Sequence, residues 1–210
     1  MNKLFLFLIV LMLICSCVGK HNSNAQKVKI DKVHEEQYSL TKDTLQIDLS
    51  NSSIHWKGTK MRGAGKHEGQ IQLQDGYFLT DQNKLVGGRF SINMNTIQVT
   101  DIPEHEPVPR KRFNDHMRSE DFFNTEKYPT SEFTITEIND LSTDNILVSG
   151  NLTIKGITRN ISFKAISVDK EFSTKFTFDR FKWNIAYEGS WADQTLVDRY
   201  IELSIKLKIE

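Results

Sequence analysis

The sequence predicts an all-β fold in which about eight antiparallel strands form either a sandwich or a sheet closed into a barrel. From Leu45 onward, apolar residues recur at every second position, which places them on one face of each strand. Short polar turns separate these runs at hairpin spacing. Strands with one apolar face must pack against a second sheet or close on themselves, since no residues remain for a covering layer of helices.

The first predicted strands flank a glycine-rich segment at residues 61–66. Ile54 and Trp56 share one apolar face, and Ile71 and Leu73 form the face that is expected to pair back onto it. A longer strand follows, after a polar turn. Its inward-facing positions are Val86, Gly88, Phe90, Ile92 and Met94.

One segment interrupts the alternation. A loop with three prolines, residues 101–109, is followed by residues 110–123, in which Phe113 and Met117 lie four apart and share a helical face. Pro129 then biases the residue before it toward an extended conformation. We therefore expect one short helix in a crossover connection, lying over one end of a barrel.

The remaining strands continue the alternation to the end of the chain. Turns at residues 139–140, 155–156 and 168–171 separate them. Their inward-facing positions are Phe133 and Ile135; Ile146, Val148, Gly150, Leu152 and Ile154; Ile161, Phe163 and Ala165; Phe172, Thr174, Phe176 and Phe178; and Ile201, Leu203, Ile205, Leu207 and Ile209.

Residues 1–16 are predicted to be a lipoprotein signal peptide. Lys3 precedes an unbroken apolar run, residues 4–14, which is shorter than the roughly 20 residues needed to span a bilayer. The following I-C-S-C resembles the bacterial lipobox, which implies that Cys17 is lipidated and anchors the protein to a membrane outside the cytoplasm. An ordinary signal peptide is the alternative. The polar residues 17–44 are predicted to be a tether, with a short strand possible at 27–33.

Composition excludes several classes of function. The 27 basic residues balance 27 acidic ones, so no clustered positive charge favours nucleic acid. Two cysteines, one of them predicted to be acylated, support neither a disulfide scaffold nor a thiolate zinc site. The six histidines lack metal-binding spacing, and neither G-x-S-x-G nor a P-loop is present. We predict no catalytic residues, no metal and no cofactor.

Two long motifs resemble those of the YceI-like family. They are D-H-M-R-S-E-D-F-F with K-Y-P (residues 115–129) and V-S-G-N-L-T-I-K-G-I-T-R-N-I-S-F (residues 148–163). Shorter segments at 56–58, 66–69 and 179–185 fit as well, so that the resemblance covers residues 45–210. It implies an eight-stranded, lipocalin-like barrel whose interior holds an isoprenoid or fatty-acyl chain. The proline-rich insert at residues 103–110 departs from the family pattern.

The resemblance implies a lumen, and a barrel of eight strands is wide enough for one slim ligand. Gly88 and Gly150 are expected to leave room on the inward faces. The alternative is that the aromatic side chains pack against one another and fill the barrel. The predicted lipid-binding residues are Trp56, Phe90, Ile92, Met94, Phe122, Phe123, Leu152, Phe163, Phe176 and Phe178.

The helical segment supplies further candidates. One of Phe122 and Phe123 is expected to plug one end of the barrel while the other anchors the helix; the alternative is that they form a hydrophobic staple beside the barrel. His116, Arg118 and Asp121 are candidates for contacts to a ligand head group. The alternative is that these three residues cap the helix and tie the loop down, with Arg118 paired to Asp121.

These features predict non-enzymatic binding, sequestration or transport of a long apolar lipid by a membrane-anchored extracytoplasmic protein. Two other classes stay open. A filled barrel would serve as a protein-interaction module that uses its loops, and an isoprenoid-modifying enzyme would need polar residues inside the lumen.

Overall fold

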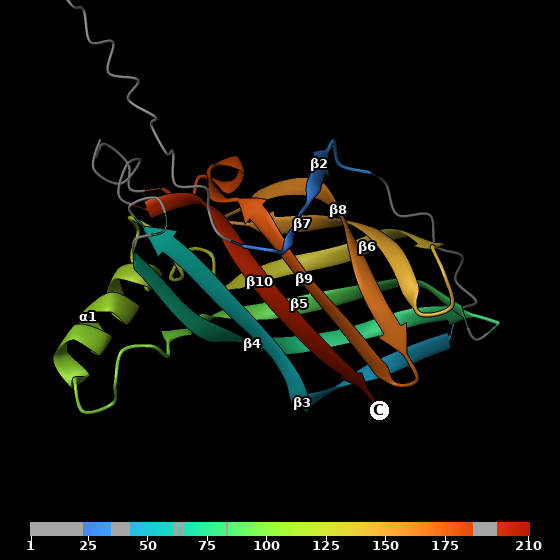
Figure 1. Cartoon of the computed structure of the whole chain (residues 1–210), viewed down its shortest axis with the longest axis horizontal. Helices are drawn as coiled ribbons and strands as arrows, with labels where there is room; N and C mark the ends of the chain where they lie inside the picture. Colours follow the sequence, from blue (N-terminus) through green and yellow to red (C-terminus); the bar gives the residue numbers. More distant parts are fainter. Residues whose placement is uncertain (1–22, 35–42, 61–62, 64, 83, 187–196) are drawn as a thin grey trace, which may run out of the picture.

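Eight strands of the described chain close into a barrel (Figure 1). The computed structural model describes residues 23–34, 43–60, 63, 65–82, 84–186 and 197–210. Each barrel strand pairs antiparallel with its neighbours in the chain, and the first pairs with the last, which confirms the closed barrel. The strands are β3 (Asp43–Lys60), β4 (Gly65–Asp81), β5 (Lys84–Val99), β6 (Thr130–Asp140), β7 (Asn145–Ile154), β8 (Ile157–Val168), β9 (Glu171–Asp179) and β10 (Val197–Ile209).

The alternation of apolar residues determines which face of each strand is buried. In β7 every second residue from Ile146 to Ile154 is buried, as the sequence predicts. Ile54 of β3 pairs with Ile71 of β4, which is also the predicted pairing. These side chains share the interior because successive Cβ atoms point to opposite faces of a strand.

β3 extends further toward the N-terminus than its apolar pattern indicates. Its pairing with β4 covers residues 43–46, breaks, and resumes at Ile54. Within the break, the Asp48 carboxylate accepts hydrogen bonds from the side chains of Ser50 and Asn51. These bonds lower the pKa of Asp48 to about 2. A local polar turn therefore takes the place of the hydrogen bonds between β3 and β4 in this break, and this is why apolar and polar residues do not alternate there.

The described chain has one α-helix, α1 (Pro107–Arg118), which lies at one end of the barrel between β5 and β6 (Figure 1). It begins earlier than predicted because proline is well suited to the first helical turn, where backbone N–H groups have no intrahelical partner. The predicted insert at 103–110 thus contributes the start of the helix. Among the described residues, no helix is long and apolar enough to cross a membrane.

A short 3-10 helix, η2 (Arg180–Trp183), follows β9 at the same end of the barrel. Arg180 is fully buried and donates hydrogen bonds to the carbonyl oxygens of Ile185 (2.6 Å) and Val197 (3.1 Å). Trp183 is also fully buried, and its Nε1 donates to the carbonyl oxygen of Leu152 (3.1 Å). These bonds fix the segment after β9 to the start of β10 and to β7.

The end of the barrel opposite α1 is packed with apolar side chains. They come from the strand segments farthest from the helix, as the pairing of β3 with β10 and of β7 with β8 shows. All belong to the buried core: Ile47, Phe78, Ile146, Ala165 and Ile209. The barrel is therefore closed at this end by close packing.

Residues 23–34 form an N-terminal strap across the gap between β8 and β9 (Figure 1). β8 and β9 pair directly at only three positions, next to their connecting turn. Farther along, β1 (Gln26–Lys27) pairs in parallel with β9, and β2 (Lys29–Asp31) pairs antiparallel with β8. Part of the segment predicted to be a tether thus belongs to the barrel wall, including the possible strand at 27–33.

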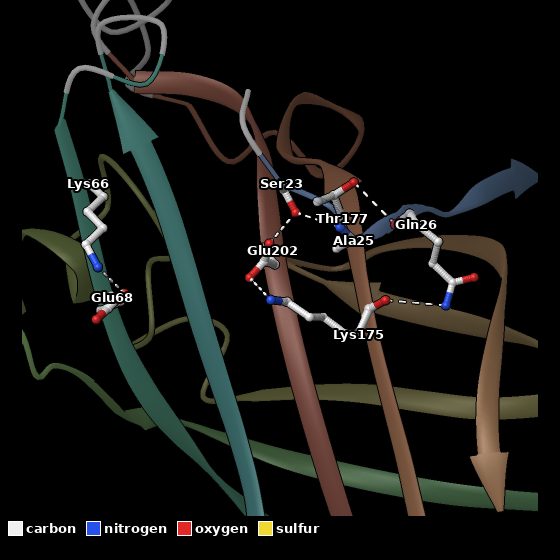
Figure 2. Close-up of polar contacts among 8 residues, drawn as sticks. All are labelled: Ser23, Ala25, Gln26, Lys66, Glu68, Lys175, Thr177 and Glu202. Carbon is white, nitrogen blue, oxygen red and sulfur yellow. Dashed lines mark hydrogen bonds and ion pairs between the residues drawn. The ribbon is translucent and has the colours of Figure 1, made fainter. Parts of the chain in front are cut away.

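Side chains fasten the strap to the neighbouring strands, and Figure 2 shows those contacts that involve β9 and β10. The Gln26 side-chain amide donates to the carbonyl oxygen of Lys164 (2.7 Å) and accepts from the Lys164 backbone N–H (2.7 Å). It also donates to the carbonyl oxygen of Lys175 (3.3 Å), and so links β8 to β9 where their own ladder is absent. Val28 and Ile30 pack against the core. The strap is held because it replaces missing backbone pairing and covers apolar side chains.

Candidate functional site

The barrel encloses a cavity of about 230 Å³. Residues of all eight barrel strands, of α1 and of the segment after α1 line it. Apolar cavities of about 150 Å³ stay dry and accept guests of the size of benzene. This interior is larger than that and nearly all apolar, so it differs from the filled barrel that an interaction module would use.

All ten residues predicted to line a lumen do line this cavity. Four phenylalanines from β5, β6, β8 and β9 form a belt around its wall. Their ring centroids are 6.4 Å apart for Phe90 and Phe133, 5.7 Å for Phe133 and Phe163, and 4.6 Å for Phe163 and Phe176. Phe133 belongs to the belt although it was predicted only as a strand position. Such a belt presents ring faces and edges to an apolar chain.

Gly88 and Gly150 do not create the space, contrary to expectation. A Cβ atom added at Gly150 would lie 2.5 Å from Cζ of Phe133, and one added at Gly88 would lie 2.6 Å from the carbonyl oxygen of Tyr77. Neither glycine lines the cavity. The volume that each glycine frees is taken up by neighbouring chain, so these glycines permit close packing of the wall.

Phe122 and Phe123 both line the cavity at the α1 end. Their ring centroids are 5.0 Å apart with the rings nearly perpendicular. Adjacent side chains face the same space because α1 has already ended, and the chain turns through hydrogen bonds from Phe122 N to Ser119 O and from Phe123 N to Met117 O. Both rings therefore line the end of the lumen, whereas the prediction assigned one ring to the barrel end and the other to anchoring the helix.

The three head-group candidates occupy different places. His116 lines the cavity, with its ring centroid 5.8 Å from that of Phe122. Arg118 does not line it, and donates from Nη2 to the carbonyl oxygen of Ile97 (3.1 Å), which ties the end of α1 to β5. Asp121 is exposed and also outside the lining. Of the three, only His116 lines the cavity. Arg118 ties the loop to a neighbouring strand, as the alternative expects, but through Ile97 and not through the ion pair with Asp121 that was predicted.

Polar residues gather at the α1 end of the cavity, where they form a rim of Thr59, Lys60, His67 and His116. His67 packs against Phe113 of α1 (centroids 4.5 Å apart), and its Nδ1 lies 3.3 Å from a carboxylate oxygen of Asp101. From the sequence alone, His67 stands out only as part of the family motif at residues 66–69, because nothing local shows that β4 begins beside α1. The mouth of the lumen is therefore at the helix, opposite the packed end.

In the part of the chain that the structure describes, no group of three His, Cys, Asp or Glu side chains is arranged to hold a metal ion. Cys17, the predicted lipidation site, and the predicted signal peptide at residues 1–16 lie outside the described residues. The described site is thus a blind apolar lumen with a polar rim.

A closed eight-stranded barrel with an apolar lumen is a lipocalin-like architecture. The chain belongs to the YceI-like family, because the YceI-like domain model matches residues 45–209. A UPF0312 protein of Shewanella denitrificans is 31% identical over 100 residues, which are 48% of this chain and 49% of that protein. The chain spans about half the length of the curated relatives it matches.

Two solved structures share the fold. BcnA of Burkholderia cenocepacia has a TM-score of 0.60 and 20% identity, and the match covers 77% of this chain and 98% of that one. A polyisoprenoid binding domain from Saccharophagus degradans has a TM-score of 0.56 and 13% identity, with 79% and 97% covered. At these sequence identities the two comparisons show that the fold is shared, and nothing beyond the fold.

Proposed function

We propose that the protein binds a long apolar lipid, of the polyisoprenoid or fatty-acyl type, inside the barrel, without modifying it chemically. The observation that carries the proposal is the blind apolar lumen with its belt of phenylalanines. The similarity in fold to a polyisoprenoid binding domain supports it. The tail of the ligand would lie toward the packed end, and its other end would lie beneath α1.

Burial of the chain would supply most of the affinity. Each Å² of apolar surface removed from water contributes roughly 25 cal/mol, with no need for directional contacts. A site of this kind separates chains of similar length weakly, because one methylene group is worth only about 1 kcal/mol. The protein would therefore accept a range of chain types and sequester or transport them.

The proposal extends to the setting of the protein. Cys17 would be acylated and would anchor the chain to a bacterial membrane, on the periplasmic side or at the cell surface. A lipid carrier held there could take up and release chains near the bilayer.

Native mass spectrometry of the purified full chain, followed by solvent extraction, tests the binding proposal. We expect a bound lipid at a ratio of about one per protein, as one lumen per barrel requires. The extract, analysed by chromatography and mass spectrometry, should contain a long-chain lipid. A protein that stays ligand-free in native spectra, even after incubation with bacterial lipid extract, would contradict the proposal.

A further inference from the structure

Two buried polar atoms of the cavity wall have no hydrogen-bond partner among the residues that the structure describes. They are Nε1 of Trp56 and Oγ of Ser131, on side chains that are 7% and 5% exposed. A third such atom, Nε of Arg118, belongs to a side chain outside the cavity lining whose Nη2 is bonded to Ile97. Buried polar groups in native proteins nearly always have a partner, so each exception asks for an explanation.

The fold satisfies a comparable group elsewhere. Trp183 is buried at the same end of the barrel, and its Nε1 donates to the carbonyl oxygen of Leu152 at 3.1 Å. Thr59 at the rim is likewise bonded to Asp198. Trp56 and Ser131 differ from these residues in that both line the lumen with nothing in the described chain to receive their hydrogens.

Trp56 is held in place by its surroundings. Its ring lies parallel to that of Phe113 of α1, with centroids 6.3 Å apart and planes within 9°. On β4, Gly69 leaves room for the indole, because an added Cβ would lie 2.7 Å from Cε2, the atom bonded to Nε1. The donor is therefore fixed by packing, without any hydrogen bond of its own.

Ser131 interrupts an apolar row. It lies two residues before Phe133 and four before Ile135 on β6, and all three side chains line the cavity. Its register partner on β5 is Ile92, which lines the cavity as well. An apolar residue at this position would extend the apolar wall, whereas serine places a hydroxyl in it.

Both residues lie toward the α1 end of the lumen, next to the polar rim. Trp56 packs on Phe113 of α1, and Ser131 is the second residue of β6, which starts after the α1 connection. An indole N–H only donates, so its partner must be an acceptor, and the serine hydroxyl can donate to an acceptor too. The two donors therefore select an oxygen atom at this depth.

We propose that the ligand carries acceptor oxygen, in a carbonyl, ester, ether or hydroxyl group, at the end of its chain next to α1, and that Trp56 Nε1 and Ser131 Oγ donate to such oxygen atoms. The inference rests on the proposed function, since it concerns the same lumen. It makes Trp56 and Ser131 residues that determine specificity: a pure hydrocarbon leaves both donors unpaired, and an oxygen-bearing chain of equal length satisfies them.

Two probes of equal chain length test the inference. Methyl palmitate carries ester oxygens, and n-octadecane carries none. Each is delivered from cyclodextrin to the delipidated full chain, and the amount retained is measured by gas chromatography after free probe is removed. We expect the dissociation constant of methyl palmitate to be lower by roughly tenfold or more, the effect of one or two additional hydrogen bonds.

Three variants identify the donors. Ser131→Ala and Trp56→Phe should each lower the retention of methyl palmitate relative to that of n-octadecane by roughly five- to tenfold. The melting temperature of delipidated Ser131→Ala should not fall, because its hydroxyl has no partner to lose; a structural hydroxyl would lower it. Ile154→Val trims one methyl group from the lumen and should affect both probes equally.

The outcomes separate this inference from the proposed function. Equal retention of both probes by the wild type, or an ester preference that survives in Ser131→Ala and Trp56→Phe, overturns the inference and leaves lipid binding intact. Retention of neither probe overturns the proposed function and this inference with it. An ester preference that Ser131→Ala abolishes without loss of stability supports the inference, even if Trp56→Phe fails to fold.

Discussion

Single phenylalanine residues set the width of the lumen. Phe163 is 4% exposed and contacts ring neighbours on both sides, Phe133 and Phe176, in the belt. A larger ring at this position has no free wall to enter, because neighbouring strands are already in contact through their aromatic side chains. Additional ring atoms must therefore project into the cavity or displace the belt.

Phe163→Trp should block lipid uptake with the fold preserved. We expect retained lipid, measured by native mass spectrometry, to fall by roughly tenfold or more, at a stability cost of about 1–3 kcal/mol for overpacking. Phe163→Leu is the matched control, since it removes the ring and leaves the lumen open. If Phe163→Trp retains lipid as the wild type does, the belt does not border the ligand.

At the scale of elements, the strap adds a charged contact to the wall. Glu202 of β10 is 5% exposed although it lies on the outer face, where it accepts from Ser23 and pairs with Lys175 at 2.9 Å (Figure 2). Burial by itself raises the pKa of Glu202, but the hydrogen bonds from Ser23 and Lys175 outweigh it and lower the pKa below 4.5. The ionised carboxylate therefore holds the start of the strap.

Acidification should remove the contribution of the ionised Glu202 carboxylate to the stability of the folded chain. Because the pKa of Glu202 is lower in the folded chain, the stabilisation is complete above pH 4.5 and is lost as the pH falls through the folded value. Glu202→Gln should cost about 1–2 kcal/mol near pH 7. Melting curves from pH 7 to pH 3 should show this difference between wild type and variant staying constant to about pH 5 and then shrinking.

Glu171→Gln is the control for that series. Glu171 also has a lowered pKa, through Lys206 and Lys208, but its side chain is 45% exposed, so its ion pairs contribute little to stability. A Glu202→Gln effect that does not depend on pH, or that grows on acidification, would show that the charge of Glu202 does not hold the strap.

For the whole molecule, the position of the strap indicates which end of the barrel would lie near the proposed membrane anchor. Five residues separate Cys17 from Ser23, and a chain of that length reaches at most about 20 Å. Ser23 is hydrogen-bonded to Glu202. The register partners of Glu202 on the neighbouring strands are Lys57 of β3 and Thr177 of β9, which lie near the α1 end of the strands. On the proposed acylation, the cavity mouth rather than the packed end would lie close to the bilayer.

Cys17→Ser tests the anchor in the living cell. The variant cannot be acylated at this position, so we expect it to leave the membrane fraction and to lose the mass of the acyl groups, with lipid binding by the barrel unchanged. Fractionation with immunoblotting and intact-mass analysis measure both effects. A serine variant that fractionates with membranes as the wild type does would contradict acylation at Cys17 as the anchor.

The strand faces and eight of the ten lumen residues could be predicted because alternation is local. An inward residue is recognised from its neighbours two positions away, whatever the strand pairs with. Phe122 and Phe123 were included for another reason, the family motif, and both line the cavity although they follow the helix. Ser131 was within reach of the same pattern, as it precedes Phe133 and Ile135 at the alternating spacing.

The remaining features depend on contacts between distant parts of the chain. Apolar alternation alone allowed a sandwich as well as a barrel, and only the pairing of β3 with β10 closes the sheet. The space that Gly150 frees is taken by Phe133 from the next strand. Arg118 binds a carbonyl of β5 instead of pointing at a ligand. None of these partners is a sequence neighbour.

The amphipathic strands and their meeting apolar faces follow from the sequence alone, since the period of two is a property of the extended backbone. That these faces surround a space, that residues 23–34 complete the wall, and that the donors of Trp56 and Ser131 have no partner in the described chain follow only from the folded structure. Closure, packing and hydrogen-bond satisfaction depend on neighbours that folding brings together, and no local pattern contains them.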